Sequence, residues 1–454
     1  MAMAKIDKMS TICAISTPYG SGGIAVIRIS GESAIPIADR LFHGRKSLME
    51  AAAYTVHDGE IVSPVDKDDV LDQVLVSVFR APHSFTGEDV VEIACHGSTY
   101  IQQTLLQWLV DAGCQLAKAG EFTQRAFLNG KMDLTEAEAV ADLIAAQTKA
   151  EKDLAISQLR GGISNELAAL RERLLTITSL IELELDFADH EELEFADRTQ
   201  LNELAQEIDT KIGCLVASFK TGNAIKQGIP VAIIGAPNVG KSTLLNALIG
   251  EERAIVSDIQ GTTRDTIEDT LVLGGMLFRF IDTAGLRQTN DAIESMGIER
   301  SRQAAQKAAV ILHLQDALQP VYTLSEWEVI SDKKIIHVYN KVDLTPSFAT
   351  AEGTIAISAK NRDIDLLKQE LLAFAAKQCD MRNAITISNT RHYEALTRAQ
   401  DAIKRVQDGL QMQISGEFLS MDLQDCLTAL GEITGKISSQ EVLNNIFSKF
   451  CIGK

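Results

Sequence analysis

The pattern of apolar and polar positions divides the chain into three kinds of region, and the first kind covers about the first 125 residues. Short strand-like runs rich in apolar residues are separated there by turns that contain Gly, Pro and Ser. The runs predict strands at 11–16, 23–30, 71–79 and 89–94. One helical pattern follows at 100–112. We therefore expect a mixed α/β domain over residues 1–127.

The second kind of region is helical, with apolar residues recurring every three or four positions, as on one face of a helix. Such stripes run through 163–185, 201–216, 396–410, 419–430 and 443–450. Capping-box spacing predicts helix starts at Thr135, with Glu138, and at Ser438, with Glu441. The helical segments are expected at 128–224 and 379–454.

The third kind of region lies between these two helical segments, where strand-like runs alternate with helices. The runs are at 231–234, 278–281, 310–314, 335–339 and 355–357. This alternation predicts a mostly parallel sheet with helices on both faces. We expect an α/β domain at 225–378, inserted into one helical domain whose halves pack together because each apolar stripe needs a partner. The alternative is two separate helical domains.

Composition narrows the class of protein. The 454 residues are 46% hydrophobic and 23% charged, which is typical of a globular protein of about three domains. A net charge of −19 argues against a broad basic face for duplex nucleic acid. Part of that charge is an acidic run at 182–197, either a solvated helix end or a docking surface for a basic partner. Scattered cysteines, no membrane-length apolar run and no signal peptide predict a cytoplasmic protein.

One glycine-rich segment carries a strong chemical signal. Residues 235–242 fit G-x-x-x-x-G-K-[ST] between an expected strand and an expected helix. Backbone N–H groups of such a loop surround phosphate oxygens, and the helix N-terminus favours an anion. Lys241 can reach the β- and γ-phosphates, and the Ser242 hydroxyl can ligate Mg²⁺. The segment predicts a nucleoside triphosphate site.

Three further motifs follow in the order of a GTPase. Residues 282–285 (Asp-Thr-Ala-Gly) end an expected strand and can hold a Mg²⁺-bound water and sense the γ-phosphate. Residues 340–343 (Asn-Lys-Val-Asp) end a later strand, and Asp343 can accept two N–H groups of guanine that adenine lacks. Residues 358–360 (Ser-Ala-Lys) offer backbone N–H groups to guanine O6. Together they predict guanine specificity.

The hydrolytic residues are less determined by the motifs. Leu286 stands where many small GTPases have the glutamine that orients the attacking water. Glu294 and Asp291 are both open candidates for that role. Thr262 and Thr263 are both candidates to complete the Mg²⁺ shell.

Several longer segments add a resemblance over the full length of the chain. They are GGIAVIRISG at 22–31, PHSFTGED at 82–89, GEFTQRAFLN at 120–129, GTTRD at 261–265, DTAGLR at 282–287 and FCIGK at 450–454. With these segments in this order, the chain resembles the bacterial tRNA-modification GTPases called MnmE or TrmE. The resemblance implies an N-terminal folate-binding and dimerisation domain, a helical domain and an inserted Ras-like GTPase domain.

The resemblance also implies an activity. Members of the family are homodimers that act with the flavoprotein MnmG (GidA), in a heterotetramer or larger complex. Together they add a carboxymethylaminomethyl or aminomethyl group at C5 of the wobble uridine, U34, of certain tRNAs. The one-carbon unit comes from 5,10-methylenetetrahydrofolate, of which 5-formyl-tetrahydrofolate is an analogue.

Ligand assignments follow from the motifs and the resemblance together. The GTP residues are Asn238, Val239, Gly240, Lys241, Ser242, Thr243, Ser257, Thr262, Thr263, Asp282, Thr283, Ala284, Gly285, Asn340, Lys341, Asp343, Ser358, Ala359 and Lys360. The resemblance places Mg²⁺ on Ser242 and Thr263. It places K⁺ near Asn238, Ser257, Ile259 and Thr262, where the ion can neutralise charge on the phosphates.

Catalytic and folate residues complete the expectations. The resemblance assigns water orientation to Glu294, alongside catalytic roles for Lys241 and Thr263. Its folate residues are Arg28, Glu92, Lys131 and Lys454. Spacing alone gives no reason to select these four from other surface charges. Cys451, in the terminal motif, is expected to be a packed thiol rather than a nucleophile.

Two other classes of GTPase compete with this interpretation. A ribosome-assembly GTPase would need a dedicated RNA-binding domain after the GTPase core, where 379–454 shows only amphipathic helix. A membrane-remodelling GTPase would need a basic or apolar membrane-facing stripe, which the helical segments lack.

Overall fold

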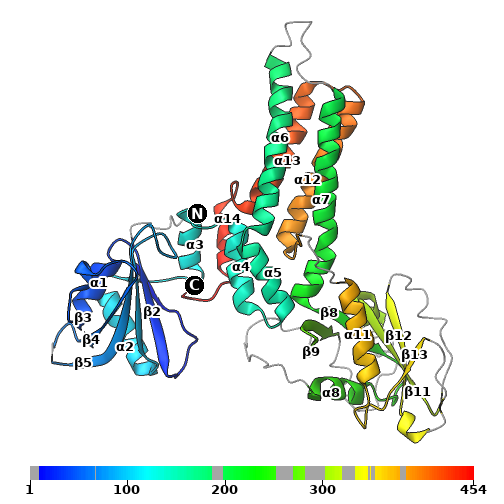
Figure 1. Ribbon diagram of the computed structural model, residues 1–454, viewed down its shortest axis with the longest axis horizontal. Helices are drawn as coiled ribbons and strands as arrows, with labels where there is room; N and C mark the ends of the chain where they lie inside the picture. The colour runs from blue at the N-terminus through cyan, green and yellow to red at the C-terminus, as the bar shows by residue number, and fades with distance from the viewer. Residues whose placement is uncertain are drawn as a thin grey trace. The chain divides into compact units, whose positions relative to one another are not determined.

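The computed structural model describes most of the chain in two compact units (Figure 1). The described residues are 10–66, 68–186, 198–251, 269–281, 302–319, 333–345, 348, 353–378 and 385–453. Unit 1 comprises 1–141, 158–164 and 431–454, and unit 2 comprises 142–157 and 165–430. The C-terminal segment therefore belongs to the same unit as the N-terminal segment. The domain boundaries expected at 127, 224 and 378 stay predictions.

Unit 1 contains a seven-stranded sheet in the order β3-β4-β5-β6-β2-β1-β7. The strands are β1 (Ile12–Ile15), β2 (Ile24–Ser30), β3 (Phe42–Gly44), β4 (Thr55–Val62), β5 (Val70–Phe79), β6 (Val90–His96) and β7 (Gln115–Leu116). All neighbours are antiparallel except β1 and β7. Alternate residues such as Ile27, Val76 and Ile93 are buried against α1 (Ala34–Leu41) and α2 (Thr99–Asp111). A short 3₁₀ helix, η1 (Leu48–Glu50), joins that core.

The rest of unit 1 is helical and includes the end of the chain. The helix α3 (Glu121–Leu128) contacts α14 (Gln440–Phe447), and α4 (Leu134–Ala145) begins in this unit. Buried side chains join these elements: Leu134, Ala137, Leu443, Phe447 and Phe450. The following residues reach β1, because Ser16 Oγ donates to the Gly453 carbonyl at 3.2 Å. The last described residue thus lies at the end of β1, which is next to the edge strand β7.

Two helix starts differ from the capping boxes that the sequence favoured. The box at α4 is formed by Asp133 and Glu136, whose side chains accept each other's backbone N–H at 2.8 and 2.9 Å. The prediction at Thr135 is wrong by two residues, because the buried leucine before it already belongs to the first turn. The cap of α14 is Ser439 rather than Ser438, and its hydroxyl accepts an N–H at 3.3 Å.

Unit 2 contains a six-stranded sheet in the order β13-β12-β11-β8-β10-β9. The strands are β8 (Ile229–Ile234), β9 (Asp269–Leu273), β10 (Met276–Phe280), β11 (Val310–Asp316), β12 (Lys334–Asn340) and β13 (Thr354–Ala356). All pairs are parallel except β9 with β10. One face packs on α8 (Lys241–Glu251) and α11 (Asp365–Gln378), and the other on helical residues around 304–308. The predicted mostly parallel, two-sided sheet is confirmed.

The long helices of unit 2 pair across the sequence. They are α5 (Lys149–Leu159), α6 (Gly162–Asp186), α7 (Arg198–Gln227), α12 (Thr390–Gln411) and α13 (Gly416–Thr434). Helix α7 packs along α12, where Phe219 stacks on Tyr393 with 4.4 Å between ring centroids. Gln400 Nε2 also donates to Asp209 Oδ1 at 3.0 Å. The two helical segments therefore pack together, and separate helical domains are excluded. Within the described ranges, no helix has the length and apolarity needed for a membrane span.

Candidate functional site

The phosphate-binding motif forms the turn between β8 and α8 (Figure 1). Gly235 and Gly240 have φ of 155° and 98°, conformations that L-residues rarely adopt. A Cβ on Gly235 would collide with the Leu314 carbonyl oxygen, and one on Gly240 with the Asn340 amide. Because α8 begins at Lys241, the N–H groups of its first turn point toward this loop. The backbone is therefore shaped to bind an anion.

Lys241 lies across its own loop. Its Nζ donates to the carbonyl oxygens of Gly235 at 2.8 Å and Ala236 at 2.9 Å. Burial lowers the pKa of Lys241 below its usual value. The half-buried Ser242 follows in the first turn of α8. An ammonium group and a hydroxyl thus stand beside the amides that would surround a phosphate.

Asn340 connects the phosphate loop to the second loop expected to bind the base. It ends β12 with only 3% of its surface exposed. Its Nδ2 donates to the Val239 carbonyl at 2.8 Å, and its Oδ1 accepts the Ala359 N–H at 3.0 Å. One side chain therefore sets the spacing of two loops that lie more than a hundred residues apart in the sequence.

The two guanine motifs meet at a single carboxylate. The Ser358 hydroxyl donates to Asp343 Oδ1 at 2.7 Å. Backbone bonds between Ser358 and Asp363, at 3.0 and 3.1 Å, hold the hydroxyl in place. Asp343 is half-buried, and Lys360 at the end of the second motif is exposed. The structure therefore brings 340–343 and 358–360 together, and guanine binding by these two motifs stays a prediction.

One residue of this site was not predicted from the sequence. Asp316 ends β11, and its Oδ2 accepts Lys341 Nζ at 2.7 Å. The same ammonium donates to the Asn238 carbonyl of the phosphate loop at 2.8 Å. Burial raises the pKa of Asp316, but the hydrogen bonds from Lys341 and the Leu318 amide lower it by more. The pKa of Asp316 is therefore below its usual value. Its place at the carboxyl end of a central parallel strand was an available signal.

The remaining predicted nucleotide and metal residues lie outside the described part of the chain. They are Ser257, Ile259, Thr262, Thr263, Asp282, Thr283, Ala284, Gly285 and Glu294. Asn238 and Ser242 are the described members of the two predicted metal sites. Among residues that the structure describes, no group of three or more His, Cys, Asp or Glu could hold a metal ion.

A second cluster in unit 1 contains predicted folate residues. Arg28 on β2 lies directly opposite Glu92 on β6, and Arg28 Nε donates to Glu92 Oε1 at 2.8 Å. The guanidinium carbon lies 5.5 Å from the ring centroid of Phe85 and 5.6 Å from that of Phe122. Arg28 also reaches the Gly453 carbonyl at 3.5 Å. An ion pair, two aromatic rings and the C-terminal segment thus meet on one face of the sheet.

The other predicted residues of unit 1 lie around this cluster. Lys131 is exposed and donates to the Pro82 carbonyl at 3.1 Å, in the segment that also contains Phe85. Lys454 lies outside the described residues. Cys451 is exposed, so the expectation of a packed thiol is wrong. Its backbone carbonyl accepts the Gly120 N–H at 3.4 Å.

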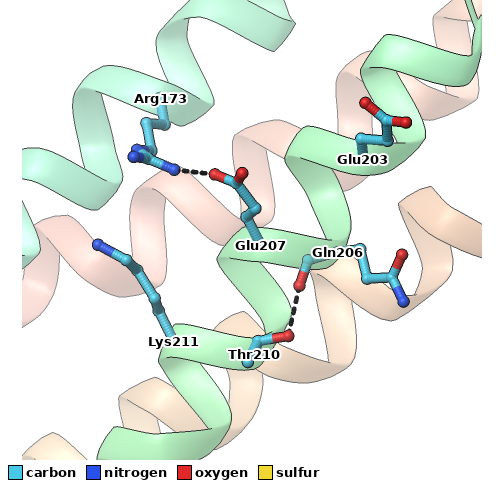
Figure 2. A pocket seen from close by; sticks show the side chains of 6 residues that line it. All are labelled: Arg173, Glu203, Gln206, Glu207, Thr210 and Lys211. Carbon is cyan, nitrogen blue, oxygen red and sulfur yellow. Dashed lines mark hydrogen bonds and ion pairs between the residues drawn. The ribbon is translucent and has the colours of Figure 1, made fainter.

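A hollow on the helices of unit 2 has a different character (Figure 2). It is lined by Arg173, Glu203, Gln206, Glu207, Thr210 and Lys211. Arg173 pairs with Glu207, and Lys211 with Glu166 at 3.2 Å. Because these cations face carboxylates at an exposed surface, we assign the hollow no ligand.

Comparison with known proteins gives full-length relatives. Family models described as "GTP-binding protein TrmE N-terminus" and "MnmE helical domain" match residues 11–131 and 134–451. The tRNA modification GTPase MnmE of Parabacteroides distasonis is 54% identical over 98% of this chain and 100% of its own length. That of Flavobacterium johnsoniae is 50% identical over 98% and 99%.

One solved structure matches part of the chain. The G domain of the T. maritima FeoB iron transporter is 22% identical over 32% of this chain and 98% of its own, with a TM-score of 0.25, too low to support an argument. The full-length relatives and both family models confirm the resemblance, so the chain belongs to the MnmE family of tRNA modification GTPases.

Proposed function

We propose that this chain is the GTP-hydrolysing component of a complex that modifies C5 of the wobble uridine U34 of certain tRNAs. Its family membership supports the activity. The main structural support is the pair of hydrogen bonds by which the Asn340 side chain bridges two loops. That bridge joins a phosphate loop to a base loop, as a nucleotide site requires. We further propose a cytoplasmic homodimer that acts with the flavoprotein MnmG (GidA).

The described residues have distinct proposed roles toward GTP. Lys241 and the amides of 238–243 bind the phosphates, because both present N–H groups at the start of α8. Asp343, oriented by Ser358, accepts two N–H groups of guanine. Asp316 and Lys341 fix the backbone of the phosphate loop at Asn238. Ala359 and Lys360 complete the base loop.

We also propose two cations at this site. Hydroxyl and carbonyl oxygens are suitable ligands for Mg²⁺, which would be held by Ser242 and Thr263. K⁺ would be held near Asn238, Ser257, Ile259 and Thr262. When bound, these ions neutralise negative charge on the phosphates. Glu294 orients the attacking water.

The potassium proposal predicts a salt effect on the rate. GTP hydrolysis is expected to be at least about tenfold faster in KCl than in NaCl at equal ionic strength, because the ion replaces a cationic group at the developing charge. Phosphate release measures the rates, and GDP affinity in the two salts controls for binding. Equal rates would contradict the K⁺ assignment at Asn238.

The cluster around Arg28 is the proposed folate site. A pterin is flat and has adjacent N–H donors, which suit the Glu92 carboxylate and the rings of Phe85 and Phe122. Lys131 and Lys454 add positive charge for an anionic tail. The bound group would supply the one-carbon unit, and 5,10-methylenetetrahydrofolate is the proposed form.

The proposed function predicts a defined change in tRNA. Deletion of the gene is expected to abolish the U34 modification, and the wild-type chain to restore it. Lys241→Ala and Arg28→Ala are expected to restore less than about a tenth, because each removes the main cation of its site. Arg40→Ala is the matched control, since that arginine is exposed at the end of α1. Nucleoside mass spectrometry is the measurement, and an unchanged wobble uridine in the deletion strain would refute the proposal.

A further inference from the structure

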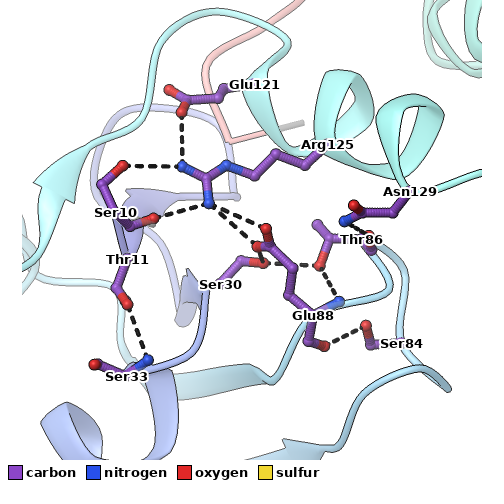
Figure 3. A network of polar contacts seen from close by, with 10 residues as sticks. All are labelled: Ser10, Thr11, Ser30, Ser33, Ser84, Thr86, Glu88, Glu121, Arg125 and Asn129. Carbon is purple, nitrogen blue, oxygen red and sulfur yellow. Dashed lines mark hydrogen bonds and ion pairs between the residues drawn. The ribbon is translucent and has the colours of Figure 1, made fainter. Parts of the chain in front are cut away.

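A buried arginine, Arg125, joins three segments of unit 1 (Figure 3). Arg125 on α3 is 3% exposed. Its Nη1 donates to the Ser10 carbonyl at 2.8 Å and to Glu88 Oε1 at 3.2 Å. Its Nη2 donates to Glu121 Oε1 at 3.0 Å and to Ser10 Oγ at 3.3 Å. One guanidinium thus links the start of the described chain, the 82–89 segment and α3.

The chemistry of this network requires an arginine. Two carboxylates share the one cation, and each has a further donor: Ser30 Oγ to Glu88 at 2.7 Å, and the Lys118 N–H to Glu121 at 2.9 Å. A lysine would keep the charge but not the planar fork that reaches all these acceptors. Removing one member of a buried ion pair leaves an uncompensated charge. The network is therefore sensitive to conservative changes.

The network also holds both rings that lie over Arg28. Phe85 lies in the 82–89 segment, which also contains Glu88. The hydroxyl of the neighbouring Thr86 lies 2.8 Å from the hydroxyl of Ser30, two residues after Arg28 on β2. Phe122 follows Glu121 on α3. Each ring therefore belongs to a segment whose carboxylate is bonded to Arg125, although Arg125 itself makes no described contact with Arg28.

We propose that Arg125 is a positioning residue of the folate site: through Glu88 and Glu121 it fixes the two rings that hold the Arg28 guanidinium beside Glu92. The inference rests on the proposed folate function. It adds a role for a buried residue that acts through Glu88 and Glu121. Neither the network nor its connection to Arg28 is evident from the motifs.

Two variants test this role. Arg125→Lys keeps the charge and loses the fork, and Glu88→Gln keeps the shape and loses one carboxylate; Glu88→Gln decides the matter if Arg125→Lys fails to fold. Each is expected to weaken 5-formyl-tetrahydrofolate binding about tenfold or more, with GDP affinity unchanged within about twofold. Isothermal titration of the full chain measures both affinities. The control is Arg173→Lys, which changes an arginine–glutamate pair on the exposed helical surface of unit 2 (Figure 2).

A spectroscopic signal separates positioning from general stability. Ring currents of Phe85 and Phe122 shift the Arg28 Nε–H resonance, which is assigned by its loss in Arg28→Lys. In both variants that resonance is expected to move, whereas a change of stability alone leaves the native-state shift as it was. Unchanged folate affinity and an unmoved resonance overturn the inference. If the wild-type chain binds no folate, the proposed function fails, and the Arg28 resonance still decides whether Arg125 positions that group.

Discussion

Replacement of Asp343 by asparagine is expected to lower the affinity for GTP by about 10³-fold and to give the protein affinity for xanthosine triphosphate. The Asp343 carboxylate can accept two N–H groups of guanine, whereas an asparagine amide offers one oxygen and a donor that faces a guanine donor. Xanthine has a carbonyl oxygen in place of that guanine donor, so it can accept the N–H of the asparagine amide and the pairing is restored. Ser358 donates to Asp343 Oδ1 at 2.7 Å, so the orientation of the side chain is already fixed in the structure.

The measurement for this change is the affinity for fluorescent guanine and xanthine nucleotides, together with phosphate release from each triphosphate. Asp365→Asn is the matched control, because that carboxylate is exposed in the first turn of α11. GTP affinity equal to that of the wild type would show that Asp343 does not recognise guanine. Loss of affinity for both nucleotides in a folded variant would contradict the expected change of specificity from guanine to xanthine.

The parts of this site that the sequence predicted are those encoded locally. The phosphate loop depends on glycines at 235 and 240 that need positive φ, and both are visible in eight consecutive residues. The central strands β8, β11 and β12 are mostly apolar, as buried parallel strands are. In each case one short segment contains the whole signal.

Strands β3, β4, β7 and β9 were missed because their sequences carry less of that signal. Strand β7 has only two residues, and β4 contains exposed positions and a glycine within a polar sequence. Strand β9 pairs with β10 through Gly274 and Gly275, which have φ of 58° and 78°. That glycine pair is a hairpin signal which the sequence offered and the prediction did not use.

Contacts between distant segments could not be predicted from a single sequence. Asp316 acquires its role only when β11 and β12 are adjacent, which brings it to Lys341. Arg125 and Glu88 are charged residues that a sequence pattern assigns to the surface, yet the fold buries the arginine and pairs the two. The ring contacts of Arg28 depend on the same folding of distant segments.

Replacement of Asn340 by alanine is expected to weaken nucleotide binding about 100-fold and to destabilise the α/β part of unit 2 by about 3 kcal/mol. The change removes two hydrogen bonds and leaves the Val239 carbonyl and the Ala359 N–H without their partner in a buried place. Unpaired buried groups cost more than the bonds contributed, because neither group regains water. Both loops of the site should therefore loosen together.

This coupling is what distinguishes Asn340 from an ordinary contact residue. Hydrogen exchange is expected to accelerate in 235–242 and in 358–363, although the two segments are far apart in sequence, and saturating GDP should slow it in both. Asn361→Ala is the matched control, because that side chain is exposed in the same base loop. Faster exchange in only one segment would mean that the phosphate and base loops are held independently. The nucleotide, rather than Asn340, would then be the link that sets their spacing.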